Sequence, residues 1–413
     1  MAIGFAAFRP GPAVAQHLLV PMDNAQANHL KAYGLAYWTL QRDATVEWLL
    51  NYRAGSFLLP DGSTIRREAA LRGVTVEPIS AGRLSAVRAE IEASNMESVI
   101  LETAPKIAVY TVPGARPWDD AVTLALTYAG IEYDQLWDPA VVEGALDRYD
   151  WLHLHHEDFT GQYSKFYITY AGSAWLQTEV TRNRRVAAEL GFDDVPALKK
   201  GVAEEIRAYV ENGGFVFAMC TATETIDLAL AAIGVDIAAS YADGDGPDPN
   251  AAQRLDWERT FAFEDAELIT DPSLSAFSDI DGHLVNTPLR QPLGAFRLFD
   301  FSAKIDPVAA MLTQSHERVI ADFYGLTTSY RRSRVKRSVT VLAEESGAPW
   351  VKYIHGNYGQ GTWTFLGGHD PEDPQHVIGD PPTDLDLHPH SPGYRLILNN
   401  VLFPAAKKKH LKT

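Results

Sequence analysis

Short apolar runs alternate with longer segments of helical periodicity along most of the chain. Residues 17–23 and 46–52 are apolar enough for buried strands, and residues 24–42 between them repeat aromatic and aliphatic side chains at helical spacing. This order predicts a β-α-β unit. A small α/β domain of residues 17–104 is expected, completed by helices at 63–72 and 81–96 and strands at 74–79 and 97–103.

The alternation of strand and helix starts again after Pro105. Residues 240–315 have little regular periodicity and are expected to be an insertion, after which strands resume. The order predicts a doubly wound, mostly parallel sheet, which binds ligands at the carboxyl ends of its strands. Its expected elements are strands at 106–110, 149–155, 215–219, 319–324, 338–343, 350–355 and 362–366, and helices at 118–130, 195–212 and 392–403.

One of these strands leads directly into the only cysteine of the chain. The run Phe215–Met219 ends at Cys220, and a helical segment follows at once. A tight strand-to-helix turn requires small residues on both sides of its central residue, and Ala218 and Ala222 occupy those positions. A helix N-terminus also favours a thiolate over a thiol. Cys220 is therefore a candidate nucleophile, while the alternative interpretation makes it a small apolar residue at a strand end.

Histidine and acidic residues gather at the predicted carboxyl ends of two other strands. His155 and His156 follow one strand, and His369 follows another. Nitrogen and oxygen donors at adjacent strand ends suit a divalent metal such as zinc or manganese. The candidate metal ligands are His155, His156, Asp158, His369, Asp373 and His376, with Glu157 and Asp370 beside them.

Composition and charge limit the kinds of molecule that the chain is expected to bind. The chain has 413 residues, of which 46% are apolar, as in an ordered globular protein. Its net charge of −17 disfavours nucleic acid as a partner, because phosphate binding needs a basic face. No apolar run reaches the roughly 18 residues of a membrane span. A single cysteine excludes an internal disulfide.

The two ends of the chain differ from the rest in composition. Residues 1–16 are small and apolar and end in Ala13-Val14-Ala15-Gln16, a pattern typical of a signal-peptide cleavage site. They are expected to be the remnant of an export signal, which favours a periplasmic or exported location over the cytoplasm. Residues 404–413 form a basic tail.

The cysteine turn and a late Gly-Gly-His motif resemble the class I glutamine amidotransferase-like superfamily. Cys220 matches the elbow of that family, and Gly367-Gly368-His369-Asp370-Pro371-Glu372 matches its His-Pro-Glu with one residue inserted. The resemblance covers residues 105–403 without the insertion. It implies a flavodoxin-like domain with a triad of Cys220, His369 and Glu372. The ending of the chain is also similar to the trehalose-utilisation-protein-like branch of the same fold.

The resemblance implies a thiol-dependent hydrolase or amidotransferase that acts on a C–N bond of a small molecule. Cys220 would be the nucleophile, His369 the base and Glu372 the orienting acid, with no cofactor required and a synthetase as a partner. A metal-dependent hydrolase and a non-catalytic ligand-binding domain are the alternatives. The whole chain also resembles proteins labelled asparagine synthetase B, although the catalytic cysteine at the start of the mature chain and the ATP pyrophosphatase loop of such enzymes are not found in this sequence.

Overall fold

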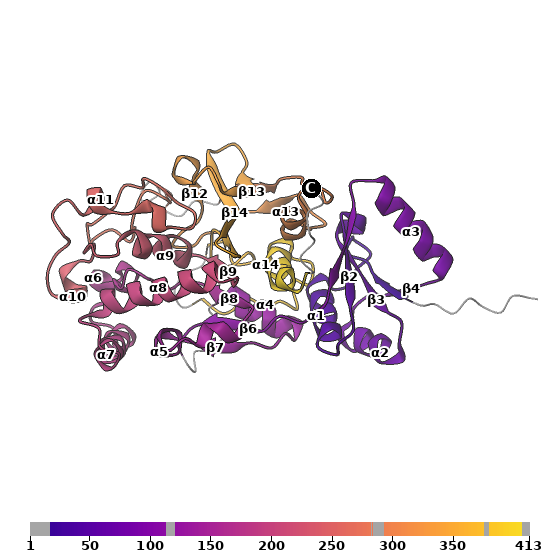
Figure 1. The fold of residues 1–413 in the computed structure, drawn as a ribbon, viewed down its shortest axis with the longest axis horizontal. Coiled ribbons are helices and arrows are strands. Elements are labelled where there is room, and N and C mark those ends of the chain that lie inside the picture. Colours follow the sequence, from indigo (N-terminus) through magenta and orange to yellow (C-terminus); the bar gives the residue numbers. More distant parts are fainter. Residues whose placement is uncertain (1–16, 113–119, 282, 284–292, 376–379, 407–413) are drawn as a thin grey trace, which may run out of the picture.

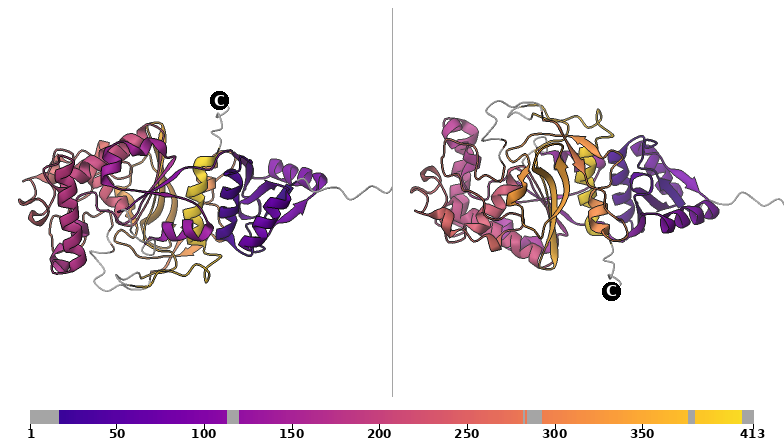
Figure 2. Two further views of the ribbon diagram at one scale, coloured as in Figure 1. Left: turned by 90° about the horizontal axis from the view of Figure 1, so that it is seen from below. Right: turned by 90° about the horizontal axis from the view of Figure 1, so that it is seen from above.

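The computed structural model describes residues 17–112, 120–281, 283, 293–375 and 380–406. The expected export-signal remnant, residues 1–16, lies outside these ranges. The described residues form two β-sheets separated by a shared layer of helices (Figure 1). Helix α1 (His29–Leu40) follows the first strand. It packs against α4 (Ala121–Ala129) and α14 (Pro392–Leu402), which follow strands of the second sheet in the chain. Both views of Figure 2 show α14 lying between the sheets. One hydrophobic core therefore continues from the first sheet into the second.

The first sheet has five strands, and its neighbouring pairs are antiparallel. Its order is β4-β1-β3-β2-β5, so β1 and β2 run parallel with β3 inserted between them. The predicted β-α-β unit therefore has the expected direction, but its two strands are not neighbours. The sequence prediction omits β3 because its apolar run is short and follows a tight turn. The strands are β1 (His17–Val20), β2 (Val46–Leu50), β3 (Ser56–Pro60), β4 (Glu77–Ile79) and β5 (Glu97–Leu101).

Helix α1 is buried on most sides because it lies between the sheets. Its first turn is capped by Asn28, whose side chain accepts a hydrogen bond from the Lys31 N–H at 2.9 Å. Gly34 allows α1 to approach α4 closely, since a Cβ at this position would lie 1.8 Å from the carbonyl oxygen of Ala129. The other helices of this part are α2 (Ser63–Arg72) and α3 (Ala81–Ala93).

The second sheet has ten strands and is mixed. The neighbours β7-β6-β8-β9-β15 are parallel, whereas the pairings among β15, β14, β13, β10 and β11 are antiparallel, and β12 pairs with β14. The mostly parallel, flavodoxin-like sheet is therefore not confirmed. A tight turn at Gly359, which has a positive φ of 57°, joins β14 to β15, and so short a connection makes antiparallel neighbours.

The strands of the second sheet are, in chain order, β6 (Ile107–Tyr110), β7 (Asp134–Leu136), β8 (Trp151–Leu154), β9 (Phe215–Met219), β10 (Ala295–Leu298), β11 (Val319–Ala321), β12 (Tyr330–Arg331), β13 (Thr340–Glu345), β14 (Trp350–Tyr358) and β15 (Gly361–Leu366). Its parallel strands are covered on both faces. In β6, Ile107 and Val109 join the core shared with the first sheet, whereas Ala108 and Tyr110 join a second core on the other face. Burial on both faces explains why these strands are continuous apolar runs in the sequence.

The second core lies beneath α8 (Val195–Glu211), α9 (Thr221–Ala231) and α7 (Ala174–Glu189). None of the helices in the described ranges is long and apolar enough to cross a membrane. The shorter helices are α5 (Asp138–Val142), α6 (Tyr167–Tyr170), α10 (Ser240–Asp243), α11 (Ala251–Arg254) and α13 (Pro307–Leu312).

A buried arginine of α14 ties the two sheets together. Arg395 donates hydrogen bonds to the carbonyl oxygens of Met22 and Ala54, at 2.9 and 2.8 Å, and to Nδ1 of His316 at 2.9 Å. The ring of His29 stacks on that of His316, with the centroids 4.2 Å apart. Burial and then the charge of Arg395 lower the pKa of His29 to about 3, so this imidazole is neutral at pH 7.

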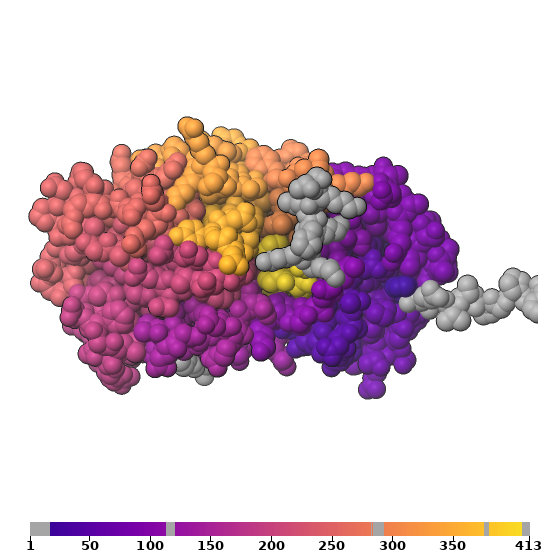
Figure 3. All heavy atoms as spheres, in the orientation of Figure 1, coloured from indigo at the N-terminus to yellow at the C-terminus, as the bar shows by residue number. Residues whose placement is uncertain are grey.

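Residues just after β10 also contact the N-terminal part of the chain, where the orange and purple regions of Figure 3 meet. The Ala303 N–H donates to the side-chain oxygen of Asn95 at 3.0 Å, and Lys304 donates to the carbonyl oxygen of Glu92 at 2.5 Å. The two sheets are thus joined by surface contacts as well as by the helix layer.

Candidate functional site

The carboxyl ends of three adjacent strands meet at one edge of the second sheet. β9 lies between β8 and β15, so His155, Cys220 and His369 follow neighbouring strands. Backbone hydrogen bonds join these ends: the Cys220 N–H donates to the Gly368 carbonyl at 3.1 Å, and the Ala222 N–H donates to the His155 carbonyl at 2.9 Å. The sheet therefore brings together candidate residues that lie far apart in the sequence.

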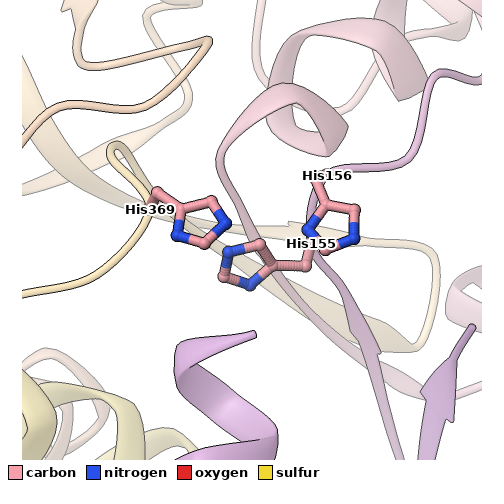
Figure 4. Close-up of side chains that lie close together, drawn as sticks. All are labelled: His155, His156 and His369. Carbon is pink, nitrogen blue, oxygen red and sulfur yellow. The ribbon is translucent and has the colours of Figure 1, made fainter. Parts of the chain in front are cut away.

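Three histidines converge at this edge (Figure 4). His155, His156 and His369 each offer a ring nitrogen, and these three atoms lie within 4.8 Å of one another. The ring centroids of His155 and His369 are 4.5 Å apart, and those of His155 and His156 are 5.2 Å apart. Imidazole nitrogens at such separations can face one common point, so the cluster has the composition of a metal site with three nitrogen ligands.

A second row of polar side chains lies behind His155. The Nδ1 atom of His155 and the Nε2 atom of His153 are each 3.4 Å from Oδ1 of Asp120. The other ring nitrogen of His153, Nδ1, donates to the carbonyl oxygen of Phe217 at 3.0 Å. Burial would raise the pKa of Asp120, but the charges and hydrogen bonds of His155 and His153 hold it well below its usual value. Nδ1 of His155 also lies 3.2 Å from Nε2 of His153, which is an acceptor because the other ring nitrogen of His153 donates to Phe217. With this nitrogen and the Asp120 carboxylate as the facing acceptors, the proton of His155 is held on Nδ1.

The remaining nitrogen of His155 is a buried atom with an unused lone pair. Its side chain is 2% exposed, and Nε2 has no hydrogen-bond partner among the described residues. Burial lowers the pKa of His155 more than Asp120 raises it, so the ring is neutral at pH 7. A buried polar atom without a partner costs free energy. Coordination of a cation at Nε2 would remove that cost.

The structure does not place every predicted ligand in this cluster. Asp158 is buried, and its carboxylate accepts hydrogen bonds from the N–H groups of Thr160, Gln162 and Ser164 at 2.8–3.0 Å. It therefore holds its own loop, in which Ser164 and its two neighbours all have positive φ. Asp158 and Asp373 do not belong to the described group of ligand atoms that lie within 4.8 Å of one another. His376 lies outside the described ranges.

Glu372, the predicted orienting acid of the triad, faces a different imidazole. Its carboxylate lies 2.9 Å from Nδ1 of His388, and its N–H donates to Asp370 at 2.9 Å. Asp370 also accepts a hydrogen bond from the Thr383 hydroxyl at 2.7 Å. The segment after His369 is therefore held in a turn by carboxylates that serve local hydrogen bonds.

Cys220 has the backbone geometry of a strained strand-to-helix turn. Its φ of 50° and ψ of −139° lie in a region that residues other than glycine rarely adopt, between the end of β9 and the start of α9. The side chain is 1% exposed. Its described hydrogen-bond partners are the Leu326 N–H at 3.3 Å and the Thr221 hydroxyl at 3.7 Å, and His369 is not among them. Burial raises the pKa of the thiol, although these donors oppose the shift.

Sequence reasoning missed Asp120 and His153. The pattern His153-Leu154-His155 contained a signal, because residues two apart in a strand point to the same face. Asp120 could be recognised only as the N-cap of α4, where its side chain accepts from the Val122 and Thr123 N–H groups at 2.8 and 3.0 Å. Its contact with two imidazoles depends on how α4 lies over the sheet.

No family model matches the chain, and no curated protein matches it. Solved structures that resemble it include a cytoplasmic protein from Salmonella typhimurium, at 12% identity and a TM-score of 0.34, which covers 73% of this chain and 100% of the other. A ThuA-like protein from Bacteroides uniformis has 10% identity and a TM-score of 0.30, covering 71% of this chain and 90% of the other. Gan42B, a GH42 beta-galactosidase, has 9% identity and a TM-score of 0.29, covering 75% of this chain and 32% of the other. These scores identify neither a family nor an activity.

Proposed function

We propose that the chain holds a divalent cation on His155, His156 and His369 and acts as a metal-dependent hydrolase on a small-molecule substrate. One observation carries the proposal. The Nε2 atom of His155 is buried without a described partner inside a cluster of three imidazoles, while its Nδ1 atom faces Asp120. Metal-binding histidines in proteins are oriented in this way, by a carboxylate on the nitrogen that does not bind the metal.

The donor set fits zinc best. Neutral imidazoles bind zinc at about 2.0–2.1 Å, and three protein ligands leave a fourth position for water or substrate. Manganese prefers more oxygen ligands than this cluster offers. A zinc ion would lower the pKa of a bound water to about 7 and so supply hydroxide for hydrolysis at neutral pH. His155 would hold the ion from the buried side, and Asp120 would keep the ring in the correct tautomer.

The test is metal content and zinc affinity of the purified full chain. We expect close to one equivalent of zinc to remain bound after the protein is loaded with zinc and dialysed against metal-free buffer. His155→Ala, His156→Ala and His369→Ala should each abolish tight binding. His17→Gln, which changes a histidine in the first sheet, is the matched control and should retain the ion. Stoichiometric zinc in the triple-alanine variant would refute the proposal.

A thiol-dependent hydrolase is the second candidate, favoured by the strained backbone of Cys220. In that case the Leu326 N–H, which already donates to Sγ, would stabilise a thiolate. Cys220→Ser separates the two candidates, because serine retains the volume but is a much weaker nucleophile at this position. Once a hydrolysed substrate has been found in a screen of amides and esters, the metal hypothesis predicts that Cys220→Ser keeps activity and His155→Ala loses it. The thiol hypothesis predicts loss in Cys220→Ser.

A further inference from the structure

A large cavity lies at the opposite edge of the second sheet from the histidines. Its volume is about 960 Å³, within the range of small-molecule sites. Phe215 and Gly361, the first residues of β9 and β15, line it, so it is at the amino ends of these strands. α13 forms another wall, and Val99 of β5 contributes from the first sheet. The cavity is therefore separate from the histidine cluster and is formed where the two sheets approach each other.

The walls are mainly apolar and aromatic. The rings of Phe215 and Phe403 meet edge to face with centroids 5.1 Å apart, and His355 lies against Phe403 at 6.1 Å. Val308 and Met311 of α13 face the same space. Burial lowers the pKa of His355 to about 4, so it is neutral at pH 7 and adds no positive charge to the cavity. These side chains offer an apolar surface to the body of a ligand.

The charged residues among the described lining of the cavity all have the same sign. Among its described lining residues, Asp147, Asp150 and Asp306 carry negative charge, and none is lysine or arginine. All three carboxylates are on exposed residues, so they stand at the rim instead of the floor. Ile305, which is 75% exposed, lies beside Asp306 and extends the apolar surface to the rim. A concave site with one sign of charge concentrates ligands of the opposite sign.

From the size of the cavity, its apolar walls and its acidic rim we propose that it binds a small amphipathic cation. The ligand would place an aromatic or aliphatic body between Phe215, Phe403 and Met311, and an amine or quaternary ammonium group near a rim carboxylate such as Asp147 or Asp306. The proposal does not depend on the chemistry of the histidine cluster, because the two sites lie at opposite ends of the same strands.

Three fluorescent probes with the same diphenylhexatriene body and different ends test the proposal. The probes carry a trimethylammonium group, no charged group, or a propionate, and their fluorescence rises on entering an apolar site. We expect the trimethylammonium probe to bind the full chain about tenfold more tightly than the propionate probe, because each rim carboxylate contributes attraction to the cation and repulsion to the anion. Equal affinities, or no saturable binding of the cationic probe, would overturn the proposal.

Two sets of variants locate the binding. The double variant Asp147→Asn, Asp306→Asn should weaken the cationic probe about threefold or more and leave the neutral probe unchanged. Its matched control, Asp193→Asn with Asp245→Asn, removes two exposed charges away from the cavity and should change neither. Asn357→Trp, at an exposed lining position, should narrow the cavity and weaken binding of all three probes. Unchanged binding in Asn357→Trp, in protein with a native circular dichroism spectrum, would place the probe elsewhere and contradict the proposal.

Discussion

Asp120→Asn should weaken zinc binding without unfolding the protein. The aspartate has two roles: its Oδ1 atom caps α4 by accepting from Val122 and Thr123, and it lies 3.4 Å from the ring nitrogens of His155 and His153. Asparagine is as good an N-cap as aspartate, so the helix should keep its first turn. The negative charge opposite Nδ1 of His155 is lost, and Nε2 of His153, 3.2 Å away, is left as the acceptor that holds the proton on Nδ1.

The expected loss of zinc affinity follows from the contact distances of Asp120. Loss of such a carboxylate partner lowers metal affinity by about 10- to 100-fold, or about 1.4–2.7 kcal/mol. The contacts here are 3.4 Å long, which is weaker than an ideal hydrogen bond, so we expect a loss near tenfold. Asp120→Ala should lose about the same affinity and, in addition, about 1 kcal/mol of stability from the missing cap.

The assay is competition for zinc with a chromophoric chelator at pH 7.5, with urea denaturation as the measure of folding. Asp194→Asn is the matched control, because Asp194 caps α8 by accepting from the Ala197 N–H at 2.6 Å but does not belong to the histidine cluster. It should leave zinc affinity unchanged. Zinc affinity within twofold of wild type in Asp120→Asn, combined with a loss in His155→Ala, would refute the positioning role of Asp120.

Three further outcomes are expected. Cys220, which is 1% exposed with a raised pKa, should react with iodoacetamide far more slowly in the native protein than in urea, as measured by mass spectrometry; equal rates would mean that the thiol is accessible. Gly34→Ala should lower the free energy of unfolding by about 3 kcal/mol in urea titrations, because its Cβ would lie 1.8 Å from a backbone oxygen; a change below about 0.5 kcal/mol would contradict this close approach. Acidification should destabilise the protein, because His29 is neutral in the folded state and takes up a proton on unfolding once the pH falls below the ordinary histidine pKa of about 6.5. The contribution of His29 to the free energy of unfolding falls by about 2 kcal/mol between pH 7 and pH 5. His29→Gln should therefore show a weaker dependence of stability on pH.

The sequence predicted the strand-to-helix turn at Cys220 and the strand ends at His155 and His369, because buried parallel strands leave continuous apolar runs that stop at polar residues. It did not predict the antiparallel pairings among β14, β13, β10 and β11. Strand direction depends on which neighbour each segment pairs with, and the order of the segments along the chain does not determine that neighbour. The three histidines that lie together were among the predicted ligands, whereas Asp120 was not. Its role arises only from the contact between α4 and β8, which no local pattern encodes.

The predicted roles of Asp158 and Glu372 show a second limit of sequence reasoning. Carboxylates next to histidines were natural candidates for metal binding or for orienting a base. In the structure Asp158 accepts hydrogen bonds from backbone N–H groups of its own loop, and Glu372 faces His388. Short acidic side chains near turns compete for local backbone donors, and residue type alone does not distinguish the two uses.

The helix layer between the sheets has a consequence for cutting the chain into smaller pieces. α1 and α14 each bury apolar side chains in a core to which both sheets contribute, and Arg395 bridges the same boundary. A fragment ending near residue 104 would expose the inner face of α1 to water, and the complementary fragment would expose α4 and α14. Unfolding of one sheet should therefore also expose the core of the other, and we expect neither half to be stable alone in expression or fusion.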